Sequence, residues 1–263
     1  MSGFSVLISD FKVAVLGRGF DFSDIRAFRF AGIAIGEPLT FNHILAMNFS
    51  DTTIPRLTSF YLEYLQQHDV SFFVKSVAAY YNQATVTRLA GSCQVDTRRA
   101  AAMALGFLGD YSSNSVLGEL LRDADRNVRL LAESSIKNVW TRDGNESQRH
   151  ELRSAMRSVA SHDFSEAVRI TNNLLDEYPL FAEARNQRGI ALFALGKFHD
   201  TVKDCAIVLD INKYHFGAAI GMGHAYLQTN KKELAIIAFQ QALKINPNLE
   251  SIKKHLNKIL QNF

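Results

Sequence analysis

Residues 216–249 read FGAAIGMGHAYLQTNKKELAIIAFQQALKINPNL, and the chain carries two earlier copies of this pattern. Residues 148–181 and 182–215 align with it as blocks of the same length, 34 residues, without an insertion. A fixed period of this length predicts a row of helix–turn–helix units that stack on one another and share a continuous core.

Small side chains recur at the eighth position of each block, as Ala155, Gly189 and Gly223. Two antiparallel helices approach closely only where a small side chain on one faces a larger side chain on the other, so these positions predict helix–helix contacts. Pro179 and Pro247 stand at the same position near the end of two blocks, where proline stops a helix.

This pattern resembles the tetratricopeptide repeat, whose unit is 34 residues. The third block carries the family's small, aromatic and proline positions as Gly223, Tyr226, Ala235, Phe239, Ala242 and Pro247. The second block departs from the family pattern at Thr201, Cys205 and Lys213. The resemblance implies three such repeats over 147–249. Residues 250–263 carry apolar side chains at helical spacing with lysines between them, which predicts a capping helix.

An upstream similarity has a different period. The alanine-rich stretch from Thr97 is followed 31 residues later by a similar stretch from Val128, and each comes after an aspartate suited to starting a helix, Asp96 or Asp125. The pair resembles HEAT repeats of the short kind found in phycobilisome-lyase-like proteins, which implies helical repeats over 53–146.

Further helices are predicted over 54–67, 70–81 and 84–91. The polar boundary near 141–146 is short, so the two sets of repeats are predicted to stack as one rod with a bend.

Residues 1–52 differ in kind. Their runs of alternating character predict a β-hairpin or small sheet, and eight of the 19 phenylalanines lie in the first 50 residues. A lone hairpin is marginal in water, so this segment packs either on the helices or on a second chain, which would make a homo-oligomer. The predicted fold is therefore mainly α, a right-handed α-α superhelix with a short β-containing N-terminal segment.

Composition and motifs argue against several functions. The net charge of +3 is too small for an electrostatic footprint on nucleic acid. Cys93 and Cys205 match no metal or redox spacing, no histidine pair has metal-ligand spacing, and no nucleophile has a base nearby in sequence. We found neither a signal peptide nor a membrane span. The sequence predicts a cytoplasmic protein that is not an enzyme, with no cofactor, no metal and no membrane partner.

In tetratricopeptide proteins the first helix of each repeat lines a concave, ligand-binding surface. The clamp that some members use for a C-terminal carboxylate pair needs lysine, arginine and asparagine at five positions. Here those positions hold Leu152, Met156, Gln187, Gly217 and Gly221. The resemblance instead implies a groove with both apolar and polar side chains, in which amides donate hydrogen bonds to a peptide main chain and an arginine binds a negatively charged group. The predicted binding residues are Arg153, Met156, Asn186, Gln187, Ile190, Gly217, Ile220, Gly221 and His224.

Gly217 and Gly221 have two interpretations. Each glycine costs about 1 kcal/mol in a helix interior relative to alanine, and the repeat pattern requires neither. Either a neighbouring helix packs closely on this bare face, or the backbone of a bound peptide lies against it.

The predicted function is a non-catalytic scaffold that binds a protein or peptide in the groove. One alternative is a nucleic-acid-binding solenoid, since Arg98, Arg99, Arg126 and Arg129 recur at repeat spacing. The HEAT-like resemblance implies instead that such arginines bond the aspartates of the adjacent turn, which disfavours nucleic acid. Another alternative is an accessory subunit of an enzyme or lyase.

Overall fold

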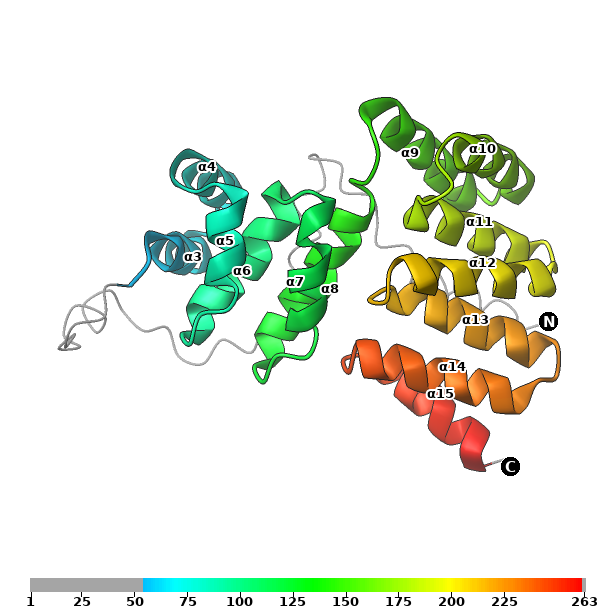
Figure 1. Cartoon of the computed structure of the whole chain (residues 1–263). Coiled ribbons are helices and arrows are strands. Elements are labelled where there is room, and N and C mark those ends of the chain that lie inside the picture. The colour runs from blue at the N-terminus through cyan, green and yellow to red at the C-terminus, as the bar shows by residue number, and fades with distance from the viewer. Residues whose placement is uncertain (1–53, 262–263) are drawn as a thin grey trace.

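The computed structural model describes residues 54–261, and within that range the regular elements are helices, without a strand (Figure 1). The predicted hairpin of residues 1–52 lies outside the described residues. An N-terminal unit comprises α3 (Arg56–Gln67), α4 (Val70–Tyr80), α5 (Gln83–Leu89), α6 (Val95–Leu108), the short 3-10 helix η2 (Tyr111–Ser113), α7 (Asn114–Leu120) and α8 (Arg126–Trp140). A repeat stack comprises α9 (Glu146–Ala160), α10 (Phe164–Glu177), α11 (Ala182–Ala194), α12 (Phe198–Ile211), α13 (Phe216–Gln228), α14 (Lys232–Ile245) and α15 (Glu250–Gln261).

Helix α6 is the centre of the N-terminal unit because its side chains are small. Its alanines from Ala100 to Ala104 are buried, and α3, α5 and α8 all pack against it. Where α6 crosses α8, a Cβ added to Gly106 would overlap the side chain of Ser135. The alanine-rich sequence therefore sets how closely these helices approach.

The helix starts follow the predicted signals only in part. Asp125 caps α8, with its side chain accepting the N–H of Val128. The prediction for Asp96 is wrong in detail, because α6 begins at Val95 after Gln94, and Asp96 lies in the first turn. There it pairs with Arg99 at 2.8 Å, which is a favourable place for an acidic side chain at a helix N-terminus.

The 31-residue period is visible in hydrogen bonds. Arg98 Nη1 donates to the carbonyl oxygens of Ser92 and Cys93 at 3.0 and 3.2 Å. Arg129, 31 positions later, donates in the same way to the two carbonyl oxygens 31 positions further along, at 2.9 and 3.0 Å. The two turns therefore have the same internal geometry.

The repeat stack follows the 34-residue period. Helices α9 and α10, α11 and α12, and α13 and α14 form antiparallel pairs, and each pair packs on the next (Figure 1). Helix α15, which closes the stack, packs on α14 and buries Ile252 and Leu256.

Two glycines at the same repeat position meet different neighbours. A Cβ on Gly223 would lie 2.6 Å from the ring of Phe239, so the third pair needs glycine there. A Cβ on Gly189 would lie 3.7 Å from Cys205, which is ordinary contact. The prediction that both glycines make room holds for Gly223 alone, because cysteine replaces the aromatic residue opposite Gly189.

The predicted bent rod is wrong. The N-terminal unit does not continue the stack by packing α8 on α9; it docks on the side of the stack, against the turns that precede α13 and α15 (Figure 1). The indole of Trp140 stacks on the ring of His215, with 4.0 Å between centroids. Asn114 and Asn212 exchange amide hydrogen bonds of 3.0 and 3.3 Å, and Asn114 also accepts from Trp140. These side-chain contacts between distant segments orient the two parts.

Candidate functional site

The nine predicted groove residues lie on the first helices of the three repeat pairs, which pack in the order α9, α11, α13. Arg153 on α9 is about half exposed, with 47% of its side chain accessible, and Met156 is half-buried. The other seven are buried, on α11 and α13. They are Asn186, Gln187, Ile190, Gly217, Ile220, Gly221 and His224.

The amides predicted to donate to a ligand are engaged within the chain. Gln187 Nε2 donates to Glu183 Oε1 at 2.6 Å, and Asn186 Nδ2 donates to the same oxygen at 3.3 Å. Glu183 is itself buried. A buried carboxylate needs such donors because unpaired burial of a charge is costly.

His215 is the third partner of Glu183. Its Nδ1 accepts the N–H of Ala218 at the start of α13, so the ring proton lies on Nε2, which faces Glu183 Oε2 at 3.0 Å. Trp140 of the N-terminal unit covers the ring of this histidine. A buried polar network therefore joins the groove helices to the docked unit, and it was not predicted because its members come from three separated segments.

One acceptor of this network is left over. The side-chain oxygen of Gln187 is buried and has no hydrogen-bond partner. An unsatisfied buried acceptor costs about 1–3 kcal/mol. This oxygen is the atom of the predicted groove that a donor from a ligand would satisfy.

His224 lies on α13 among aromatic rings. Its ring centroid is 5.1 Å from that of Phe239 and 5.5 Å from that of His255. Burial lowers the pKa of His224 from 6.5 to about 3, and His255 contributes a smaller lowering. The imidazole is therefore neutral near neutral pH and does not supply a positive charge to the groove.

The arginines behind the nucleic-acid alternative are largely compensated. Arg98 makes two bonds to the carboxylate of Asp123, at 2.7 and 2.9 Å, and Arg99 makes two to Asp125, at 2.9 and 2.8 Å. Arg129 Nε donates to the Asn248 amide oxygen at 3.0 Å. The predicted bonds to aspartates of the adjacent turn are confirmed for Arg98 and Arg99, whereas Arg129 bonds Asn248 and turn carbonyls and Arg126 is exposed.

The described part of the chain shows two further negative findings. Between residues 54 and 261, histidine, cysteine and acidic side chains form no group of three or more that could hold a metal ion. Over the same range, every helix is too short or too polar to cross a membrane. Cys205 is buried in the stack, and Cys93 is exposed.

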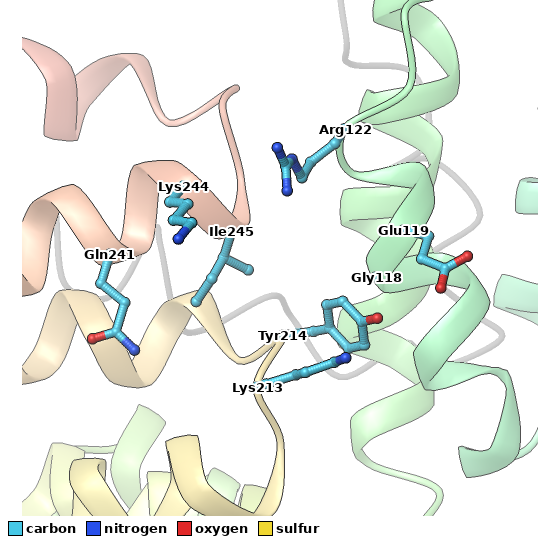
Figure 2. A pocket seen from close by; sticks show the side chains of 8 residues that line it. All are labelled: Gly118, Glu119, Arg122, Lys213, Tyr214, Gln241, Lys244 and Ile245. Carbon is cyan, nitrogen blue, oxygen red and sulfur yellow. The ribbon is translucent and has the colours of Figure 1, made fainter.

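A second feature lies where the N-terminal unit meets the stack. A cleft of about 630 Å³ lies between α7, the turn before α13, and α14, and Figure 2 shows the side chains that line it. The cleft was not predicted from the sequence, although one signal points to it: Lys213 stands where the first and third blocks carry proline. The residues that line the cleft are Gly118, Glu119, Arg122, Lys213, Tyr214, Gln241, Lys244 and Ile245.

Comparisons with known proteins support the 34-residue repeats. The tetratricopeptide repeat family model matches residues 218–249. A TPR repeat-containing protein of Rhizobium etli is 21% identical over 148 residues, which cover 56% of this chain and 72% of that protein. The solved structure of MamA AMB-1 has 15% sequence identity and a TM-score of 0.36, with 72% of this chain and 96% of that chain covered. The chain is thus a helical repeat protein in which residues 218–249 match the tetratricopeptide repeat family model.

Proposed function

We propose that this protein is a non-catalytic interaction scaffold that binds a peptide or protein along the face formed by α9, α11 and α13. The observation that carries the proposal is that the 34-residue blocks fold as three stacked helix pairs, the third of which matches the tetratricopeptide repeat family model. Stacked pairs of this kind present an extended surface to a partner. The N-terminal unit is proposed to be HEAT-like, and the repeated arginine contacts of its turns support that proposal.

A ligand would meet the two ends of this face differently. Arg153 and Met156 are accessible, so they would make the first contacts. The buried residues of α11 and α13 would follow only if the ligand replaced contacts that now bury them. The unsatisfied oxygen of Gln187 would then accept a main-chain N–H, which removes its cost.

The alternatives have less support. Nucleic-acid binding would need the arginines that are bonded to Asp123, Asp125 and Asn248. An accessory role in an enzyme or lyase, and a homo-oligomer formed through residues 1–52, depend on a segment outside the described residues.

The test compares two charge reversals on the first repeat. Arg153→Glu, combined with Met156→Glu, changes the accessible end of the proposed face. Arg169→Glu is the matched control, because Arg169 on α10 also pairs with a glutamate of its own repeat. Each protein is used as bait in cells of the native source, and bound proteins are quantified by mass spectrometry. A partner that is lost from the double variant and kept by the control supports the face.

Recovery of the same partners with all three baits would place the binding site elsewhere. Equal loss from both variants would also contradict the proposal, because the effect would then be one of general charge. Circular dichroism and the melting temperature show that each bait is folded before the comparison is made.

A further inference from the structure

The cleft between the N-terminal unit and the repeat stack has walls from both parts. One wall is α7 and the turn after it, which supply Gly118 and Arg122. The other wall is α14 with the turn before α13, which supply Lys244 and Lys213. In Figure 2 the Arg122 guanidinium reaches into the gap that separates its own turn from α14. A volume of about 630 Å³ is within the usual range for ligand sites.

The cleft is rich in positive charge, and the ammonium of Lys213 lies over the ring of Tyr214, 5.0 Å from its centroid. Arg122, Lys213 and Lys244 are all exposed, and none of the ion pairs formed within residues 54–261 includes them. Glu119 is the one acidic lining residue, and Figure 2 shows its carboxylate well apart from the nitrogens of Arg122 and Lys244. Three cations that face a common space, drawn from three elements, attract an anionic ligand.

The two walls are held in place before any ligand arrives. The ring of Tyr214 lies on the bare backbone of Gly118, where a Cβ would overlap it. The exchange of amide hydrogen bonds between Asn114 and Asn212 fixes the same turn from its other side. Arg129 ties the N-terminal unit to the turn before α15. A site assembled in advance loses less conformational entropy on binding.

We propose that this junction cleft binds an acidic peptide segment whose carboxylates pair with Arg122, Lys213 and Lys244. A peptide fits the lining better than a nucleic acid does, because the cations stand beside an amide and an apolar side chain. Gln241 can bond a peptide main chain, and Ile245 offers apolar contact beside the charges. None of the residues that line the cleft is among the nine predicted groove residues, so the proposal does not depend on binding at the α9, α11 and α13 face.

The experiment measures fluorescence anisotropy of a labelled, glutamate-rich peptide with interspersed leucines, titrated with the full chain at low salt. The test variant is Arg122→Gln combined with Lys213→Gln and Lys244→Gln. The matched control removes the same charge at exposed positions outside the cleft, by Lys231→Gln, Lys232→Gln and Lys254→Gln. We expect the Kd for the acidic peptide to rise roughly tenfold or more in the test variant and to change by less than about twofold in the control.

Three results would overturn the proposal. One is an equal rise of Kd in both variants, which would mean that net charge alone attracts the peptide. Another is the absence of saturable binding to the wild-type chain at any peptide concentration used. The third is tighter binding of a labelled single-stranded oligonucleotide of the same charge, which would make the ligand a nucleic acid. Carbodiimide cross-linking of the bound peptide, followed by mass spectrometry, is expected to label Lys213 and Lys244 ahead of the control lysines.

Discussion

At the scale of single residues, the repeat pattern specifies where a small side chain stands, but not how small it must be. Gly189 and Gly223 occupy the same position of the 34-residue block, and the larger side chain opposite them is Cys205 in one case and Phe239 in the other. The requirement for glycine is therefore a property of the pair of residues, and a sequence read one position at a time does not reveal it.

This difference predicts opposite outcomes for one substitution. Gly223→Ala places a methyl group against the Phe239 ring, and overpacking of this kind lowers the free energy of unfolding by about 1–3 kcal/mol. The methyl group of Gly189→Ala meets only ordinary contacts, so the higher helix propensity of alanine raises the free energy of unfolding by up to about 1 kcal/mol. Urea denaturation followed by circular dichroism measures both. Equal destabilisation by the two substitutions would contradict the contacts described here.

His224 predicts a pH dependence of stability. Its pKa is about 3 in the folded chain and about 6.5 when unfolded, so the unfolded chain binds the additional proton between these values. The stability that the neutral His224 provides is therefore fully present above the unfolded pKa and is lost as the pH falls below it. At about pH 5 the free energy of unfolding is lower by about 2 kcal/mol. Denaturation curves of the wild type and His224→Gln at several pH values isolate this contribution. Exposed His199→Gln serves as the control for the removal of a histidine. An unchanged slope in His224→Gln would refute the assignment.

At the scale of helices, most of the helices were predicted from the sequence, but only some of the residues at which they begin. The helices predicted between residues 54 and 91 are confirmed as α3, α4 and α5, because their apolar spacing and turn residues are local signals. The end signals are less specific: Asp125 caps α8 as expected, whereas Asp96 does not cap α6. Likewise, the prediction that Asn186 and Gln187 donate to a ligand considered one helix alone and missed Glu183 as their partner.

Asp125 combines two roles that a substitution can separate. It caps α8 through the N–H of Val128, and it accepts two bonds from Arg99 of the preceding repeat. Asp163 caps α10 in the same manner, but among the described residues its carboxylate forms no ion pair. We expect Asp163→Ala to cost about 1 kcal/mol of unfolding free energy and Asp125→Ala to cost clearly more, because Arg99 loses a partner. Thermal denaturation provides the measurement, and equal losses would mean that the Arg99 contact adds nothing.

At the scale of the whole molecule, the repeats were predictable and their docking was not. A repeat is read from residues that recur at a fixed spacing, whereas Asn114 and Asn212 meet across 98 positions that share no period. The junction cleft has the same origin, since its residues come from both parts of the chain. The groove residues were placed on the expected helices, but burial is a property of the assembled molecule, and only Arg153 and Met156 remain accessible.

The docking has a cooperative consequence, because one hydrophobic cluster runs through both parts and includes Trp140 and Phe216. Gly118→Ala forces the Tyr214 ring away from α7, so it loosens the junction at a contact that both parts share. We expect the wild type to unfold in a single calorimetric transition and Gly118→Ala to unfold in two, with the first at a lower temperature. Gly91→Ala is the control, since a Cβ there meets only the Arg88 carbonyl oxygen at 3.6 Å. A single transition in Gly118→Ala at the wild-type temperature would show that the contact between α7 and Tyr214 does not couple the two parts. In that case the acidic peptide should bind this variant as tightly as the wild type. If the junction is loosened, the cations of the cleft move apart and the peptide binds more weakly.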